Sequence, residues 1–401
     1  NLPKEQLKTR FSGVMKIARV HFYVENATVW RDWFVYRLGF QAGATSECSN
    51  TRTEVVSSGS IVFQLSSPIS PDSPVAAFLQ KYPEGVADLA FYVEDIEAIL
   101  TKAVRYGAEI LQPLQQTLQG KGYLKWATIS AWGSLSHTLI EVKGQRGKGA
   151  GGAEVISTKS SLASLSSPSH LVTCSPAQSP VLFTSIDHVV LNVAAGDLEP
   201  AIAWYENILG FQPQQDFKIQ TERSALRSRV MFHPSDRVQL PINEPVGANS
   251  QIQEFLDINR GAGVQHIALQ ASNLVPAIAR LRSAGIPFLA VPSSYYTELQ
   301  KRHQLPLTPA QLQQIAEQQI LVDWQHDGVS TNGETPPLLL QIFTKPIFSQ
   351  PTFFFELIER REGKIKGEIK LAQGFGEGNF RALFEAIERE QIKRGSLGTR
   401  G

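Results

Sequence analysis

Two histidines and one glutamate in the second half of the chain could bind a metal ion together. His188 lies in DHVVLNV, His266 in GVQHIAL and Glu356 in FFFELIER, and each segment is typical of a β-strand. Two imidazoles and one carboxylate, with the other coordination positions open, form the ligand set of non-haem Fe(II) oxygenases. The same ligands suit hydrolytic zinc, although the chain contains no HExxH segment. A carboxylate that follows three phenylalanines is costly to bury unless it is paired or metal-bound.

The chain contains an internal duplication, and each of the three residues lies at a position of the second copy that can be matched to a position of the first. Aligning Trp33 with Trp204 also brings Gly39 onto Gly210, and two further pairs of segments match downstream. Each half therefore looks like two strand-helix-strand modules, and the second helix of each half should end at a glycine. The paired segments are 17–40 with 186–211, 85–111 with 263–289, and 136–142 with 353–360.

The first copy lacks all three candidate ligands. Arg19, Asp88 and Thr138 take the positions of the two histidines and the glutamate, in that order. A single histidine on a strand is more often a core or surface residue than a ligand. Three ligand-type residues at equivalent positions of three strands are harder to dismiss, because strands lining one face of a curved sheet can bring them together. We therefore expect a metal site in the second half and no catalytic metal in the first.

Length and composition indicate a folded protein of about two domains. The chain has 401 residues, of which 42% are hydrophobic and 19% charged. The net charge of +1, from 38 Lys+Arg and 37 Asp+Glu, excludes a strongly basic surface for nucleic acid. Two cysteines, Cys48 and Cys174, cannot form a disulfide framework, and no apolar run approaches the roughly 20 residues of a membrane helix. With the polar start at 1–10, these features predict a cytoplasmic protein without membrane or nucleic-acid partners.

The duplication and a change in composition predict the domain boundaries. Residues 144–183 are rich in Gly, Ser, Ala and Pro and show no sustained periodicity, which is typical of a linker. A structureless stretch of this length is unusual inside a compact domain. We expect an N-terminal domain at 11–143 and a C-terminal domain at 184–401.

The C-terminal segment predicts a helix that could close over the site. GFGEGNF (374–380) has three glycines, so it should be flexible, and it lacks the Lys-Ser/Thr of a phosphate loop. The apolar stripe of Leu383, Phe384 and Ile387 that follows predicts an amphipathic helix with Asn379 as its N-cap. Packed across the site, this helix would act as a lid.

Several amides lie near the expected ligands. Gln265 precedes His266, so the two side chains should face opposite sides of a regular strand unless a twist or bulge intervenes. LPINEP (240–245) is bracketed by prolines and is expected to be an irregular turn, with Asn243 available as a hydrogen-bond donor. Gln341 lies on a strand-like segment that ends at Pro346.

The second half resembles the 4-hydroxyphenylpyruvate dioxygenase family of the vicinal-oxygen-chelate superfamily. The resemblance runs from residue 186 to about residue 391, and the first half is similar, more loosely, to the metal-free N-terminal domain of that family. It implies an α+β fold of two tandem open barrels, built from βαβββ modules, with a C-terminal gating helix. The Gly/Ser-rich insert departs from the compact linker expected for the family. The matching segments are DHVVLNV, LPINEP, SQIQEFL, GAGVQHIAL, LLLQIFTKP, FFFELIER and GFGEGNFRALFEAIEREQ.

The resemblance also implies an activity and a set of site residues. The expected cofactor is Fe(II), and the expected reaction converts 4-hydroxyphenylpyruvate and O2 to homogentisate and CO2 by oxidative decarboxylation, ring hydroxylation and side-chain migration. A homo-oligomer, dimer or tetramer, is expected. The implied metal ligands are His188, His266 and Glu356. The implied substrate-binding residues are Ser228, Asn243, Gln251, Gln265, Gln341, Phe343, Phe354, Phe375 and Phe380, and the implied gate residues are Gly374, Gly376, Gly378 and Asn379.

Two other functions fit the same fold. A 4-hydroxymandelate synthase would share iron and substrate but hydroxylate the benzylic carbon rather than the ring. A non-catalytic small-molecule-binding protein of the superfamily is the alternative of a different class. The intact set of ligands argues against the binding protein, because a protein without catalysis has no need for them.

Overall fold

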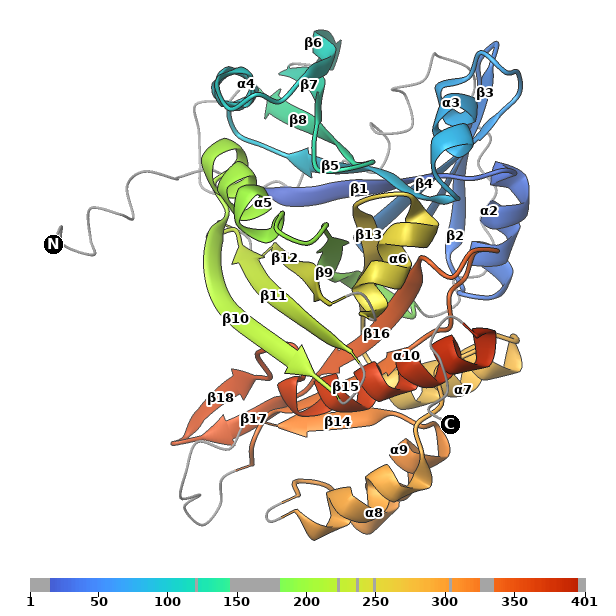
Figure 1. Cartoon of the computed structure of the whole chain (residues 1–401), viewed down its shortest axis with the longest axis vertical. Coiled ribbons are helices and arrows are strands. Elements are labelled where there is room, and N and C mark those ends of the chain that lie inside the picture. The colour runs from blue at the N-terminus through green and yellow to red at the C-terminus, as the bar shows by residue number, and fades with distance from the viewer. Residues whose placement is uncertain are drawn as a thin grey trace, which may run out of the picture.

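In the computed structural model, two eight-stranded sheets, each curled into an open barrel, form the body of the protein (Figure 1). The structure describes residues 15–119, 122–144, 181–221, 224–235, 238–247, 250–302, 305–324 and 335–395. The polar start at 1–10, the expected domain start at residue 11, Cys174 and most of the expected linker lie outside the described residues. Among the helices in these ranges, none is long and apolar enough to cross a membrane.

The first barrel is a mixed sheet with the strand order β2-β3-β4-β1-β5-β8-β7-β6. Its central strands β1 and β5 pair antiparallel, whereas β1 with β4 and β5 with β8 pair parallel. The elements are β1 (Lys16–Tyr23), α2 (Ala27–Tyr36), β2 (Gln41–Glu47), β3 (Thr51–Ser58), β4 (Ile61–Pro68), α3 (Pro74–Lys81), β5 (Gly85–Tyr92), α4 (Ile96–Arg105), β6 (Ile110–Gln119), β7 (Gly122–Ser130) and β8 (Ser136–Gly144).

The second barrel repeats this order strand for strand, as β10-β11-β12-β9-β13-β16-β15-β14, which confirms the duplication. Within the described residues, a small hairpin, β17-β18, and additional helices occur in this half and not in the first. Its elements are β9 (Phe183–Asn192), α5 (Leu198–Trp204), the π-helical turn η3 (Tyr205–Leu209), β10 (Gln212–Gln220), β11 (Ala225–Phe232), β12 (Gln239–Val246), α6 (Gln251–Asn259), β13 (Gly263–Ala271), α7 (Leu274–Ser283), α8 (Ser293–Lys301), α9 (Pro309–Glu317), β14 (Leu321–Trp324), β15 (Leu338–Phe343), β16 (Phe354–Arg360), β17 (Glu362–Ile365), β18 (Glu368–Leu371), the 3-10 turn η4 (Glu377–Asn379) and α10 (Phe380–Arg394).

Equivalent helices of the two halves begin and end by the same devices. Glu141 accepts a hydrogen bond of 2.9 Å from the backbone N–H of Ile96 at the start of α4, and Glu359 contacts the start of α7 in the same way. A carboxylate at a helix N-terminus satisfies a free N–H and complements the helix dipole. Gly107 and Gly285, with φ of 79° and 82°, follow the two helices in the left-handed conformation. The expected glycine stops are confirmed.

The segment LPINEP is a strand and not the irregular turn expected from its prolines. It forms most of β12, which pairs antiparallel with β11 along its whole length. The carbonyl of Asn243 accepts a hydrogen bond from the N–H of Val193, next to β9. Backbone groups two residues apart point to the same side of a strand, so the proline nitrogens of Pro241 and Pro245, which carry no hydrogen, also face β9. Pairing with β9 involves only three residue pairs, none of which includes a proline, so the prolines cost the sheet few backbone hydrogen bonds.

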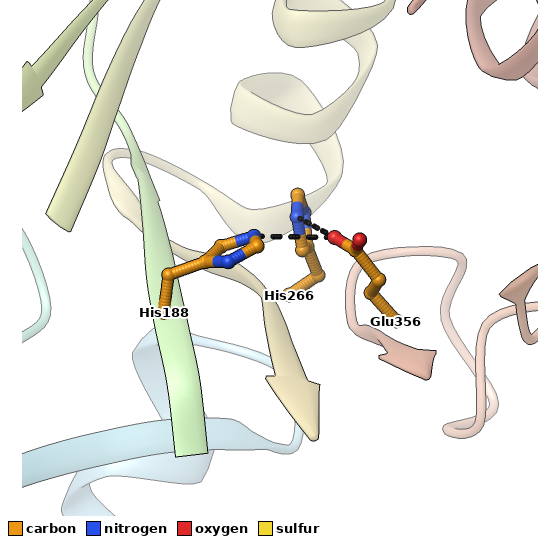
Figure 2. Close-up of side chains that lie close together, drawn as sticks. All are labelled: His188, His266 and Glu356. Atoms are coloured by element: carbon orange, nitrogen blue, oxygen red, sulfur yellow. Dashed lines mark ion pairs between the residues drawn. The ribbon is translucent and has the colours of Figure 1, made fainter. Parts of the chain in front are cut away.

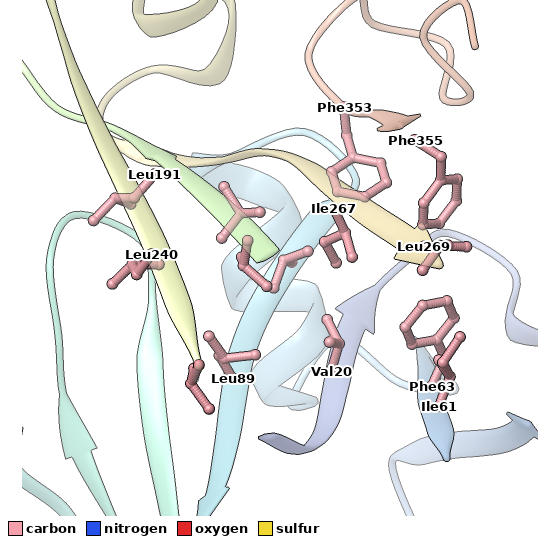
Figure 3. Packing of buried hydrophobic residues seen from close by; sticks show 14 of the residues in the cluster. Val20, Ile61, Phe63, Leu89, Leu191, Leu240, Ile267, Leu269, Phe353 and Phe355 are labelled. Carbon is pink, nitrogen blue, oxygen red and sulfur yellow. The ribbon is translucent and has the colours of Figure 1, made fainter. Parts of the chain in front are cut away.

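The two barrels share one hydrophobic core. Phe22 of the first half meets Phe353 of the second edge-on, with ring centroids 5.3 Å apart, and Phe63 stacks on Phe355 at 6.0 Å. Figure 3 shows part of this core, in which residues of the first half such as Phe63 pack together with residues of the second such as Phe355. Each half therefore holds the other in place, and the strands that carry the site are supported from behind.

We expect truncation of Phe353 to destabilise both halves. Phe353 is 1% exposed, and its removal would leave a cavity against Phe22, at a cost of about 3–5 kcal/mol in the free energy of unfolding. Urea denaturation of Phe353→Ala followed by circular dichroism measures this loss. Tyr36→Ala is the matched control, because Tyr36 is 79% exposed and its loss should change the stability little. Equal stability of the two variants would contradict the shared core.

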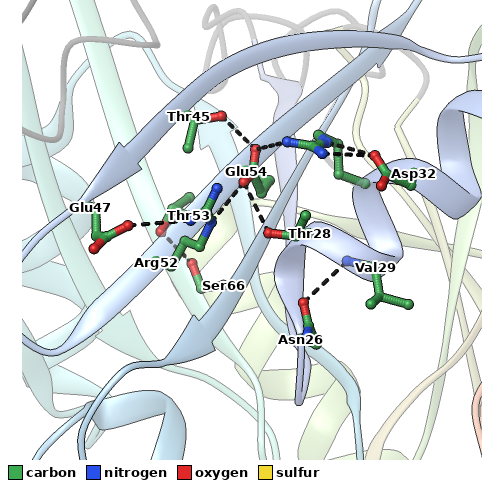
Figure 4. Close-up of polar contacts among 11 residues, drawn as sticks. Asn26, Thr28, Val29, Asp32, Thr45, Glu47, Arg52, Thr53, Glu54 and Ser66 are labelled. Atoms are coloured by element: carbon green, nitrogen blue, oxygen red, sulfur yellow. Dashed lines mark hydrogen bonds and ion pairs between the residues drawn. The ribbon is translucent and has the colours of Figure 1, made fainter.

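A buried carboxylate in the first barrel has a structural role. Glu54 on β3 is 0% exposed and accepts hydrogen bonds from Arg52 Nε at 2.9 Å, Arg31 Nη1 at 3.2 Å and Thr45 Oγ1 at 2.6 Å (Figure 4). Removing one partner of such a buried pair leaves an uncompensated charge. Glu54 therefore ties α2 to β2 and β3.

Candidate metal centre

Three neighbouring strands of the second barrel bring the candidate ligands together. His188 lies on β9, His266 on β13 and Glu356 on β16, and these strands are adjacent in the sheet. Glu356 Oε2 lies 3.1 Å from His188 Nε2 and 3.6 Å from His266 Nε2 (Figure 2). All three side chains are buried, at 2–7% exposure. The sequence expectation that the three residues converge is therefore met.

The donor atoms fit a single metal ion. Their ligand atoms all lie within 4.8 Å of one another. Nitrogen and oxygen ligands bind a first-row metal at about 2.0–2.2 Å, so ligands at right angles are about 3 Å apart. The separations of 3.1 Å and 3.6 Å are close to this value. Two imidazole nitrogens and one carboxylate oxygen on one side leave the remaining positions of an octahedron open.

Asp187 fixes the orientation of His188. Its Oδ1 lies 2.9 Å from His188 Nδ1, and because an ionised carboxylate only accepts, the proton is on Nδ1 and Nε2 points toward Glu356. Burial alone would raise the pKa of Asp187, but the hydrogen bonds from Arg360 and His188 hold it well below its usual range. Burial would likewise lower the pKa of His188, but Glu356 and Asp187 outweigh it and raise that pKa to about 9.

Glu356 is held by an amide as well as by the histidines. Gln341 Nε2 donates to Glu356 Oε1 at 2.8 Å and to the carbonyl of Phe375 at 2.8 Å. Burial would raise the pKa of Glu356, but His188 and His266 lower it below its usual range, so the carboxylate is ionised. Oε1 is therefore occupied by the amide, and Oε2 is the oxygen that faces both histidines.

The ligands lie in the wall of a cavity in the second barrel. All nine residues expected to bind substrate line the same cavity, with Gly376 and Asn379 of the expected gate. Gly374 and Gly378 lie on the same segment but outside the lining. The nine residues are Ser228, Asn243, Gln251, Gln265, Gln341, Phe343, Phe354, Phe375 and Phe380.

Gln265 and His266 reach the same cavity although they are neighbours in the chain. The register of β13 against β9 shifts between Val264 and His266, so a bulge interrupts the regular alternation that would have placed the two side chains on opposite sides. Gln265 Oε1 consequently lies 3.2 Å from His266 Nδ1. Phe354 stacks on the His266 ring from another side, with centroids 4.8 Å apart.

Asn379 does not cap α10, contrary to the expectation from the sequence. Its side chain makes no capping bond, but donates to Gln341 Oε1 at 2.9 Å and accepts from Tyr295 at 2.9 Å. Two of the glycines before it allow close approach: Gly376 has φ of 76°, and a Cβ there would collide with the side chain of Gln341, as one at Gly378 would with that of Asp323. The segment 374–380 is thus docked against Gln341, the residue that holds Glu356.

Sequence reasoning missed several residues of the cavity and its surroundings. Phe217 on the edge strand β10 meets Phe380 edge-on at 5.0 Å, and nothing in its exposed, polar surroundings in the sequence indicated this. Arg360, whose guanidinium binds Asp187, had a signal that could have been found: an arginine four residues after a ligand lies on the same face of the strand. Further lining residues are Val190, Ile219, Leu226, Val230, Pro241, Ile252, Leu383, Phe384 and Ile387.

The equivalent positions of the first barrel hold a different polar cluster. Asp88 accepts hydrogen bonds from Ser136 at 2.9 Å and Thr138 at 3.0 Å, beside the buried Arg19. Burial raises the pKa of Asp88 and lowers that of Arg19. A guanidinium and a hydroxyl in place of two metal ligands do not make a metal site.

We expect one tightly bound metal ion per chain. Double replacement of His188 and His266 by alanine should then remove all of it, because the first barrel has no equivalent ligands. Metal analysis of the dialysed proteins gives the stoichiometry. The acidic residues Asp95, Glu97 and Glu141 of the first half lie close together, but they are occupied by a helix cap and by lysine and backbone contacts. A stoichiometry of two, or metal retained by the double variant, would contradict the prediction.

Comparison with known proteins supports the fold and shows the family. The Glyoxalase/Bleomycin resistance protein/Dioxygenase superfamily matches residues 185–310. A 4-hydroxyphenylpyruvate dioxygenase of Dictyostelium discoideum is 37% identical, over 94% of this chain and 98% of its own length. One of Coccidioides posadasii is 36% identical, over 94% and 93%.

Solved structures support the architecture. A triple mutant of 4-hydroxymandelate synthase from Streptomyces coelicolor superposes with a TM-score of 0.74, at 24% identity, over 94% of this chain and 98% of its own. A fusion of a xylose isomerase-like TIM barrel with a 4-hydroxyphenylpyruvate dioxygenase gives 0.66 at 22% identity, over 93% of this chain and 52% of its own. At these identities the likeness shows the fold alone. The full-length similarity to named relatives goes further, and the chain belongs to the 4-hydroxyphenylpyruvate dioxygenase family.

Proposed function

We propose that this chain is an Fe(II)-dependent dioxygenase that converts 4-hydroxyphenylpyruvate and O2 to homogentisate and CO2. The observation that carries the proposal is the convergence of His188, His266 and Glu356 at the wall of an amide- and phenylalanine-lined cavity, in a chain 32–37% identical to named dioxygenases. The reaction balances: one oxygen atom of O2 enters the carboxylate formed as CO2 leaves, and the other enters the ring.

The chemistry of the donor set supports iron. Bound Fe(II) would supply open coordination positions for the 2-oxo acid and the electrons that activate dioxygen. His188, His266 and Glu356 would hold it, and Gln341 keeps Glu356 Oε1 turned away from it. The protein's own task is to bind and orient the substrate and to exclude water.

The cavity has the lining that an arylpyruvate needs. Ser228 on β11 is directly opposite Asn243 on β12, so a hydroxyl and an amide meet at one side of the cavity. Gln251 Nε2 is buried and has no partner in the part of the chain that the structure describes. We assign these three polar groups to the phenol end of the substrate. Phe343 and Phe380 would contact the faces of the ring.

The gate segment and α10 would exclude water during the reaction. Phe375 packs edge-on against the ring of His188 at 5.2 Å, and α10 contributes Phe380, Leu383 and Ile387 to the cavity. Closing an apolar cover over a reactive centre prevents side reactions with water. We therefore propose that 374–380 and α10 are a gate, within a catalytic domain at 184–401 that follows a metal-free domain at 11–143. A cytoplasmic location and a homo-oligomer stay predictions from the sequence.

Product analysis tests the proposal. The purified protein is incubated with Fe(II), ascorbate, O2 and 4-hydroxyphenylpyruvate, and the products are separated by chromatography and identified by mass and NMR. Homogentisate and CO2 in equal amounts are expected. 4-Hydroxymandelate as the main product would show the benzylic hydroxylation of the related synthase. An iron-loaded protein that binds the substrate without consuming O2 would show a binding protein.

A further inference from the structure

A buried ion pair lies directly behind one of the candidate ligands and outside the cavity. Asp187 and Arg360 have side chains only 8% and 9% exposed. The guanidinium binds the carboxylate through two parallel bonds, Nε to Oδ2 and Nη2 to Oδ1, both 2.7 Å. Neither residue lines the cavity in which we place the substrate. The bidentate geometry fixes the plane and position of the carboxylate.

The carboxylate in turn holds His188. Asp187 Oδ1 accepts from His188 Nδ1 at 2.9 Å, so one carboxylate oxygen is shared between the guanidinium and the imidazole. A metal-ligating histidine whose second nitrogen donates to a carboxylate is fixed in tautomer and ring orientation, and it becomes a stronger donor. In His266, by contrast, Nδ1 faces the neutral amide oxygen of Gln265 at 3.2 Å. The two histidines are therefore unequal.

Arg360 is itself fixed by the fold. It lies four residues after Glu356 on β16, so both side chains leave the strand on the same face. Its remaining nitrogen, Nη1, donates to the carbonyl of Ala372 at 3.1 Å, two residues before the gate segment 374–380 begins. The guanidinium thus joins β16, which carries Glu356, to β9, which carries His188, and to the chain leading into the gate.

We propose that Asp187 and Arg360 are positioning residues of the reaction, which orient His188 with Nε2 toward the metal and strengthen it as a ligand. This inference rests on the proposed metal-dependent function. The competing explanation is that the ion pair only ties two strands of the barrel together. The two explanations differ in metal affinity, because a purely structural tie would not change how an intact site binds an ion.

Cobalt(II) is the probe, because it binds nitrogen and oxygen sites like Fe(II) and its visible absorption reports the ligand field. Asp187→Asn keeps an acceptor for His188 but loses the charge, and Arg360→Met removes the guanidinium while keeping an apolar stem. We expect each variant to bind Co(II) about 10–100-fold more weakly than the wild type, with shifted absorption bands. Arg360→Lys should recover part of the loss, since it restores the charge without the bidentate geometry.

Arg361→Met is the matched control. Arg361 is the next residue, and it also makes a close ion pair, 2.6 Å from Glu359 Oε1, but it is not in contact with the ligands. Its Co(II) affinity and spectrum should equal those of the wild type. Wild-type affinity and spectrum in Asp187→Asn and Arg360→Met would overturn the proposal.

A double variant keeps the test valid if a single replacement fails to fold. Asp187→Asn/Arg360→Met removes both charges, and replacing a whole buried ion pair is tolerated better than leaving one charge unpaired. Because the two residues act as a unit, we expect the double variant to bind Co(II) about as weakly as either single variant. Wild-type binding by a folded double variant would equally overturn the proposal.

The outcome is independent of the reaction product. If the wild type forms no homogentisate but Co(II) binding still weakens in the variants, the proposed activity fails and the positioning role stands. If homogentisate forms and Co(II) binding is unchanged in the variants, the activity stands and the positioning role fails.

Discussion

Replacing any one of His188, His266 and Glu356 with alanine is expected to reduce homogentisate formation below about 1% of the wild-type rate, because an open metal site with three protein ligands depends on all of them. Each side chain points into the cavity from a strand whose opposite face belongs to the shared core. The fold should therefore survive, and circular dichroism should be unchanged. The measurement combines product yield with the iron content of each purified variant.

Ser228→Ala is a suitable comparison for these variants. Ser228 lines the same cavity but is not one of the three residues whose ligand atoms cluster, so iron content should stay at the wild-type value. Substantial homogentisate formation by any of the three ligand variants, with iron still bound, would contradict the assignment of that residue.

Removing the chain after Gly374 is expected to abolish homogentisate formation while metal binding survives. The truncation deletes Phe375, Phe380 and α10, which cover the cavity, but no metal ligand. Water would then reach the site, so any remaining decarboxylation should be uncoupled from ring hydroxylation. The ratio of homogentisate to CO2 measures this coupling, and cobalt binding reports the state of the site.

A milder variant distinguishes the effect of opening the cavity to water from the effect of destabilising the barrel. α10 packs on the barrel through Phe384 and an ion pair of 3.0 Å between Arg394 and Glu254, so its loss could also disturb folding. Phe380→Ala leaves these contacts and should lower the ratio of homogentisate to CO2 below one. Lys393→Ala, at an exposed position of the same helix, should keep the ratio at one. Full homogentisate yield by the truncated protein would exclude a lid.

The amino-acid sequence by itself predicted the ligand set and the duplicated architecture. Strand and helix periodicity are local signals, and the mismatch between the copies at Arg19, Asp88 and Thr138 singled out His188, His266 and Glu356 without any coordinates. The strand order, identical in the two halves, agrees with that duplication. The family resemblance named nine substrate-binding residues, all of which line one cavity, and four gate residues, of which Gly376 and Asn379 also line it.

Only the tertiary structure decided which side chains face the cavity and which residues lie in its strands. A bulge in β13 turns Gln265 and His266 to one cavity, and a sparse ladder beside β9 lets Pro241 and Pro245 lie in a strand. These outcomes depend on which strand lies alongside and in which register, and a chain read residue by residue does not contain that information.

The same reason applies to the polar contacts around the ligands. Asn379 looks like a helix cap in the sequence, but Gln341 and Tyr295, which lie 38 and 84 residues away in the chain, offer it better partners. Arg360 and Asp187 are separated by 173 residues and meet because β9 and β16 flank β13. The sequence determined which chemical groups are available. The packing of distant strands determined which of them are within hydrogen-bonding distance, because such bonds form only between groups that the fold has already brought within about 3 Å.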